Sequence, residues 1–153
     1  MSEILPKSIE LEVFVHATED EEKVLQAAFN LMPSNFKDKV KIRRDALRGY
    51  YRNQIIVYRI KILKKKLAEE FLEYLFDRFD DNELSLLSQE LEMRLDKAGT
   101  VYLRIDKQSA YRGKPVIRQI DDAIKVKINT AKPPALTNKD IIKAFRNFYL
   151  VKQ

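Results

Sequence analysis

Cysteine and tryptophan are absent from the 153-residue chain, and His16 is its single histidine. Without cysteine the protein can form no disulfide and no thiolate metal site, and a lone histidine cannot complete a zinc ligand set or a Ser/His/Asp constellation. The Walker and dinucleotide-binding glycine patterns are missing as well. We therefore expect no enzyme activity, no catalytic residue, no metal and no cofactor.

Glycine, proline and long apolar runs are also scarce. Three glycines and five prolines exclude collagen-like and low-complexity chains. No stretch approaches about 18 uninterrupted apolar residues, and the first residues lack the pattern of a signal peptide. With 45% hydrophobic residues and a length that suits one domain, we expect a cytoplasmic globular protein without a membrane segment.

Positive charge is in excess and unevenly spread. The chain has 29 Lys and Arg against 23 Asp and Glu, a net charge of +6. Segments 37–66 and 101–153 each contain twelve basic residues, whereas 67–100 contains ten acidic and three basic residues. Clustered positive charge indicates a polyanionic partner better than the net value does, so the question is whether the two basic segments share one surface.

Alternation of aliphatic and polar residues predicts five strands. The pattern covers residues 9–15, 39–47, 54–63, 100–106 and 124–128. A short connection over 49–53 joins the second and third strands as a hairpin. One set of positions in each strand is aliphatic, and we expect that set to face the core, because a shift by one residue would turn it to solvent.

Helical periodicity covers much of the remaining chain. Thr18 suits the N-cap of a first helix that Pro33 ends, and two helices follow through 67–76 and 84–95. A last helix over 137–150 begins with a capping box at Thr137 and Asp140. The predicted fold class is α+β, a mostly antiparallel sheet with helices on one face, plus a C-terminal helix. We divide the chain into a domain over 1–132 and a helical extension over 133–153, packed on the domain or on a partner.

The strand positions opposite the aliphatic sets gather cations from four strands. If helices cover the aliphatic face, the other face carries eight cations and one aromatic ring: Lys39, Lys41, Arg43, Arg59, Lys61, Tyr102, Arg104, Lys125 and Lys127. We expect this basic platform to bind the phosphates of a nucleic acid. The alternative is a solvated sheet face, in which Glu10 and Glu12 of the first strand pair with neighbouring cations.

Two loops add aromatic and cationic side chains that suit RNA. They are Tyr50, Tyr51 and Arg52 at the hairpin tip, and Lys107, Tyr111 and Arg112 after the fourth strand. Tyrosine rings can stack on unpaired bases while arginine and lysine contact phosphates. Turn chemistry with one Tyr packed inward explains the first loop equally well, and a local cap by Asp106 is the plainer explanation of the second.

Groups that could serve metal or proton chemistry have simpler explanations. His16 lies at the end of the first strand, where a strand-end or capping role suffices. Asp121 and Asp122 are adjacent carboxylates at an expected turn, and their neighbours do not supply the oxygen ligands of an octahedral site.

Three blocks of the sequence resemble a known family. They are His16-Ala17-Thr18-Glu19-Asp20, Gly49-Tyr50-Tyr51-Arg52-Asn53 and the segment from Tyr102 to Tyr111, within a similarity over residues 8–130. The family is the archaeal RNA-binding family often described as predicted exosome subunits. The resemblance implies an archaeal source, a fold like that of the 5S rRNA-binding ribosomal protein, and RNA binding without a catalytic residue. Tyr50, Arg52 and Gln54 depart from the usual hairpin of the family, in which a His follows the Gly and a Gly-Asn-Pro comes later.

Two functions remain at this point, and a metal-dependent nuclease is a distant third. The first is a non-catalytic RNA-binding protein that uses the basic platform and the Tyr/Arg loops, with exosome or ribosome-related proteins as further partners that the resemblance implies. The second is a protein-interaction subunit whose basic face and last helix contact an acidic protein partner. A homodimer through the last helix also stays open.

Overall fold

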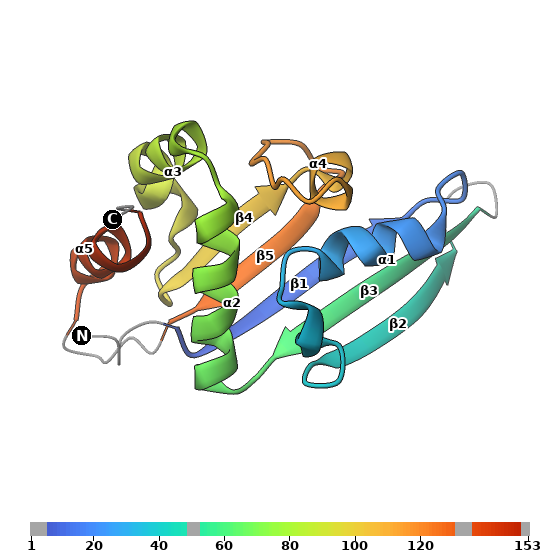
Figure 1. The fold of residues 1–153 in the computed structure, drawn as a ribbon, viewed down its shortest axis with the longest axis horizontal. Helices are drawn as coiled ribbons and strands as arrows, with labels where there is room; N and C mark the ends of the chain where they lie inside the picture. Colours follow the sequence, from blue (N-terminus) through green and yellow to red (C-terminus); the bar gives the residue numbers. More distant parts are fainter. Residues whose placement is uncertain (1–5, 49–52, 131–135, 151–153) are drawn as a thin grey trace.

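The computed structural model describes residues 6–48, 53–130 and 136–150 (Figure 1). Within these residues, five strands form one sheet, and every neighbouring pair is antiparallel: β1 (Ser8–Val15), β2 (Lys41–Arg48), β3 (Gln54–Ile62), β4 (Thr100–Ile105) and β5 (Ile124–Asn129). The strand order is β2-β3-β1-β5-β4, so β1 lies at the centre and joins the two basic segments of the sequence.

The helices gather on one face of this sheet, which confirms the predicted α+β class (Figure 1). Their bounds are α1 (Glu21–Phe29), α2 (Lys65–Arg78), α3 (Asp81–Arg94), α4 (Lys107–Tyr111) and α5 (Asn138–Tyr149), and a short 3-10 turn covers Ser34–Phe36. None of these helices combines the length and apolar character needed to cross a membrane.

The register of the sheet pairs the aliphatic residues of one strand with those of the next. Leu11 of β1 pairs with Ile60 of β3 on one side and with Val126 of β5 on the other, and all three side chains are fully buried. Paired residues of neighbouring strands point to the same face, so the cations at the intervening positions must point away from the helices. The predicted register is therefore confirmed for the central strands.

The edge strand β2 differs from the prediction. Ile42 lies on the helix-covered side by its pairing with Ile60, yet its side chain is 46% exposed. Along β2 only Asp45 is partly buried, so the helix layer does not cover this edge. Lys39 precedes β2 and lies in a turn, so the prediction that placed it on a strand of the platform is wrong.

The helix caps are partly those expected. Asp80 accepts the Glu83 amide at the start of α3, and Asp140 accepts the Thr137 amide at the start of α5. The first helix is an exception, because Asp20 rather than Thr18 accepts its free amides. Three candidate acceptors follow one another here, and the sequence does not show which one the turn after β1 brings into place.

Candidate nucleic-acid interface

Two rows of side chains cross the open face of the sheet. Read from β2 to β4 through the strand pairings, the first row is Lys41, Lys61, Glu10, Lys127 and Tyr102. The second row is Arg43, Arg59, Glu12, Lys125 and Arg104. The fold thus brings seven of the eight predicted cations, and Tyr102, onto one surface from four strands.

Carboxylates on the same face hold some of these cations. Arg59 donates from Nε to Glu12 Oε2 at 3.1 Å and from Nη1 to Asp45 Oδ2 at 3.2 Å. Arg43 also contacts Asp45, with its Nε 3.0 Å from Oδ2. The pairing that the sequence left open for Glu12 is therefore present, and Arg59 serves as a link between β1, β2 and β3 as much as a free positive charge.

Four lysines remain without an ion pair inside the described part of the chain: Lys41, Lys61, Lys125 and Lys127. Two of them lie over aromatic rings, since Lys127 Nζ is 5.8 Å from the Tyr102 ring centre and Lys125 Nζ is 5.4 Å from that of Phe14. Such contacts leave the ammonium free to bind an anion. These four lysines carry most of the uncompensated positive charge of the face.

Tyr102 is held at the edge of this surface. Its hydroxyl donates to Asp96 Oδ2 at 2.9 Å, and Asp96 also accepts the amides of Ala98 and Thr100 in the turn before β4. This hydrogen bond, with partial burial, raises the pKa of Tyr102, so the phenol keeps its proton. The ring is 40% exposed and fixed in direction, which suits contact with a base.

Lys107, which the sequence suggested as an RNA contact, is a buried residue. Its side chain is 10% exposed, and its Nζ donates to the Phe14 carbonyl at 2.6 Å, to Asp122 Oδ1 at 2.6 Å and to Glu19 Oε1 at 3.0 Å. The ammonium ties α4 to the end of β1 and to the segment before β5. The structure thus places it inside the fold, with its donors engaged, and away from the open face.

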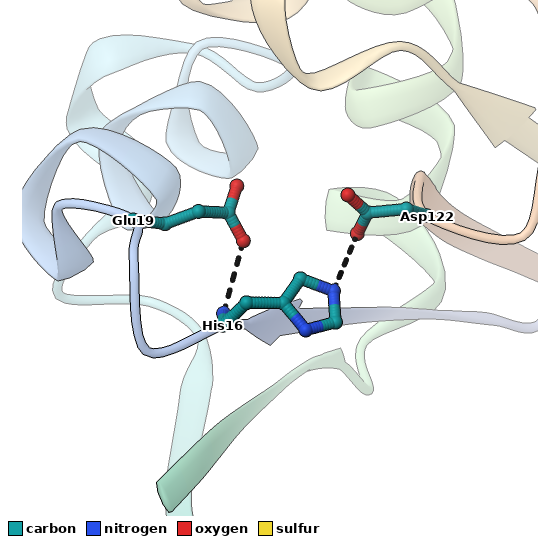
Figure 2. A group of neighbouring side chains, drawn as sticks. All are labelled: His16, Glu19 and Asp122. Atoms are coloured by element: carbon teal, nitrogen blue, oxygen red, sulfur yellow. Dashed lines mark hydrogen bonds and ion pairs between the residues drawn. The ribbon is translucent and has the colours of Figure 1, made fainter. Parts of the chain in front are cut away.

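The two carboxylates that bind this ammonium, Glu19 and Asp122, also lie beside His16 (Figure 2). His16 Nε2 lies 3.1 Å from Asp122 Oδ1, and the His16 amide donates to Glu19 Oε1 at 2.9 Å. Each of the three residues offers one ligand atom, all within 4.8 Å of one another, which resembles a metal site. The single Lys107 ammonium contacts both carboxylates and offsets part of their charge. The His16 amide, just after β1, is bonded to Glu19, which agrees with a role at the end of the strand.

Tyr111 and Arg112 lie on the helix-covered side. The Asn30 amide at the end of α1 donates to the carbonyls of Ala110 and Tyr111 at 3.1 Å each, which joins α4 to α1. Tyr111 and Arg112 both line a cavity of about 420 Å3 between α1 and α4. The structure therefore separates them from the platform, and the predicted contacts Tyr50, Tyr51 and Arg52 lie outside the described residues.

Sequence reasoning missed two residues that shape the face. Phe14 occupies the next position after Glu10 and Glu12 on the same face of β1. The alternation of the sequence could therefore have placed it among the open-face residues. Asp96 stands three residues before Gly99, a turn glycine with a φ of 87°. An Asp at this position of a turn is an expected acceptor of turn amides, whereas its bond with the Tyr102 hydroxyl has no local sequence signal.

Comparison with known proteins gives a consistent result. The family model described as RNA binding matches residues 8–130, which include all five strands and α1 to α4. The chain belongs to this RNA-binding family. A protein of Pyrococcus abyssi that is named as an RNA-binding protein is 33% identical over 142 residues, 92% of each chain. The description of the family names RNA binding and no reaction.

Solved structures of similar proteins have the same fold as this family member. A crystal structure from Archaeoglobus fulgidus is 26% identical with a TM-score of 0.79, and the match covers 95% of this chain and 99% of that one. A structure from Methanothermobacter thermautotrophicus is 30% identical with a TM-score of 0.76, over 95% and 98% of the two chains. Both are described as DUF54 proteins.

Proposed function

We propose that this protein binds RNA through the open face of its sheet and performs no chemistry on it. The observation that carries the proposal is the set of four lysines, Lys41, Lys61, Lys125 and Lys127, which lie on one uncovered face with no ion pair among the described residues. Lysines in this arrangement attract phosphates and release their counterions.

The shape of the face favours unpaired RNA. The rings of Tyr102 and Phe14 each lie beside a lysine of the open face, and aromatic rings contact bases only when these are not stacked in a helix. A strand that crosses the sheet would neutralise about four phosphates with the four lysines, and about six if it also displaces Asp45 from Arg43 and Asp121 from Arg104. The slope of log affinity against log salt is then roughly −3 to −4.

The proposal includes contacts beyond the platform. Tyr50, Tyr51 and Arg52, which lie between β2 and β3 in the sequence, would add aromatic and cationic contacts to it. Association with archaeal RNA processing or the exosome is supported by the sequence resemblance, and co-purification with exosome subunits from native cells would test it. A role of α5 as the contact with an acidic protein loses support, because Phe145 is fully buried within this chain.

A matched pair of double variants tests the proposal. We expect Lys61→Gln with Lys127→Gln to weaken binding of single-stranded RNA and to reduce the salt slope by about 1.4, that is, about 0.7 for each lost phosphate contact. Lys139→Gln with Lys143→Gln removes the same charge from α5, away from the open face, and should leave the slope nearly unchanged. Fluorescence anisotropy at several salt concentrations gives both slopes. A salt slope near zero for the native protein would contradict the proposal. An equal reduction of the salt slope in the two double variants would contradict it as well.

A further inference from the structure

A hollow of about 320 Å3 lies on the open face over β1, β5 and β4. It is lined by side chains of both charges and one aromatic ring: Glu10, Glu12, Lys125, Lys127, Tyr102 and Arg104. Cations alone would suffice to bind phosphates. The presence of two carboxylates in a hollow of this face therefore needs a separate explanation.

The two carboxylates of the hollow, Glu10 and Glu12, differ in their contacts with the rest of the fold. Glu12 accepts a hydrogen bond from Arg59, whereas no ion pair or hydrogen bond engages the side chain of Glu10 within the described residues. Its cross-strand neighbours are Lys61 and Lys127, and it is only partly buried. An unpaired carboxylate beside phosphate-binding lysines repels the phosphates, so a ligand that gains from its presence must offer hydrogen-bond donors there.

Guanine is the base that offers the matching donors. Its Watson–Crick edge presents N1–H and an N2 amine hydrogen side by side, and the two oxygens of a carboxylate can accept both. Adenine and cytosine place an acceptor nitrogen beside their amine, and uracil places carbonyls on both sides of its single N–H, so each would bring a lone pair against the second carboxylate oxygen. Bases of single-stranded RNA are free to be recognised on this edge.

Tyr102 stands on the far side of the hollow from Glu10. In the first row the two residues are separated by Lys127 alone, hence by two strand spacings, roughly 10 Å. A purine ring that is hydrogen-bonded to Glu10 along its Watson–Crick edge fills such a span and reaches the exposed ring of Tyr102. Lys61 lies beyond Glu10 in the same row, and Lys127 lies between Glu10 and Tyr102 with its Nζ 5.8 Å from the Tyr102 ring centre. Both ammonium groups would contact the phosphates next to the base.

We propose that this hollow binds an unpaired guanine of RNA, with Glu10 accepting from N1–H and the N2 amine and Tyr102 packing against the base. The inference rests on the proposed function and adds a base preference to it. The lysines supply affinity for any RNA strand, and Glu10 decides which base enters the hollow.

Short uridine-rich RNA oligonucleotides with one central G, A, C, U or inosine test this without any mutation. We expect the oligonucleotide with guanine to bind about tenfold more tightly than those with A, C or U, which is within the range of a bidentate contact between a side chain and a base. Inosine lacks the N2 amine and should lose most of that gain. Competition in fluorescence anisotropy measures all five affinities.

Glu10→Gln then tests the residue itself. The amide keeps one acceptor and adds a donor, so the preference for guanine should fall below about twofold while binding of the all-uridine oligonucleotide stays equal or becomes tighter. Glu92→Gln on α3 makes the same change in charge on the opposite layer and should keep the preference. Thermal melting checks that both variants are folded.

The outcomes separate the two proposals. Native protein that binds all five oligonucleotides equally, or a guanine preference that survives Glu10→Gln, would overturn the guanine site and leave the RNA-binding face intact. Failure of every oligonucleotide to bind would overturn both.

Discussion

Lysine side chains have two different roles in this protein. Lys61 and Lys127 end in solvent on the open face, and no carboxylate among the described residues pairs with them. Lys107 is buried, and three oxygen acceptors surround its ammonium. The residue type is the same, and the difference comes from whether the side chain meets water or acceptors that the fold has placed around it.

Lys107→Met should reduce stability rather than RNA binding. The change leaves Glu19 and Asp122 without their cation and the Phe14 carbonyl without its donor, so we expect a loss of about 2–4 kcal/mol in the free energy of unfolding. Urea denaturation measures it, with the exposed Lys114→Met as the control. A large loss of RNA affinity in a variant of unchanged stability would instead restore Lys107 as an RNA contact.

Asp122 should make the protein sensitive to acid. Burial by itself raises the pKa of this carboxyl, but the hydrogen bond and charge of Lys107, with a contribution from His16, lower the pKa below its usual value of 3.8. A carboxyl whose pKa is lower in the folded state contributes stability above its unfolded pKa and loses it as the pH falls through the folded pKa.

Asp122→Asn removes that contribution. The variant should therefore be less stable than the native protein near pH 7, and the difference should shrink as the pH falls below about 4. Chemical denaturation at a series of pH values compares the two proteins. A difference that stays constant between pH 7 and pH 3 would show that the carboxylate charge does not matter.

At the scale of elements, α5 is part of the core. Ile141 and Phe145 are fully buried, and the Phe145 ring centre lies 5.7 Å from that of Phe76 on α2 and 5.4 Å from that of Tyr149. Burial and the nearby carboxylates of Glu69 and Glu73 raise the pKa of Tyr149 well above its ordinary value. A helix of twelve residues is marginal alone in water, so this packing is what keeps it folded.

Two phenylalanines on α5 provide a matched comparison. Phe145→Ala should cost about 3–5 kcal/mol, because it opens a cavity among α2, α3 and α5. Phe148→Ala should change stability by about 0.5 kcal/mol or less, since the Phe148 side chain is 47% exposed. Urea midpoints of the two variants give the difference. Equal losses would mean that α5 does not pack on the sheet domain as the structure has it.

At the scale of the whole molecule, the two layers carry opposite charge. The uncovered sheet face presents the lysines of β2, β3 and β5, whereas the segment that forms α2 and α3 contains most of the ten acidic residues of 67–100. Such a separation orients the protein toward an RNA strand and keeps the helix layer away from it. The prediction is one binding face rather than a strand wrapped around the molecule.

Hydroxyl-radical footprinting distinguishes these arrangements. Tyr102 on the sheet face and Tyr111 on α4 are exposed to similar extents, 40% and 45%, so they react comparably in the free protein. We expect bound single-stranded RNA to protect Tyr102 and to leave Tyr111 unchanged. Protection of Tyr111 alone would move the binding site to the cavity between α1 and α4.

The sequence by itself determined the elements and the face that each strand buries. The alternation of buried and less buried residues is regular in β1 and β5, and the aliphatic set is buried in β3 and β4 as well. Val57 of β3 is an exception, because it is fully buried although it is in phase with Arg59 and Lys61. This information is local. A strand buries the face on which its apolar side chains recur at every second residue, and that pattern can be seen within the strand itself. The grouping of the cations of β2, β3, β4 and β5 on one surface follows from the same phase.

Only the tertiary structure decided which charged side chains form ion pairs. Lys107 meets Glu19 across 88 residues and Arg59 meets Glu12 across 47, and no local pattern encodes such pairs. The same holds for Glu10, whose lack of a partner depends on where the side chains of β3 and β5 end. The net effect of a charge depends on its nearest opposite charge and on water, and both are set by contacts between distant segments.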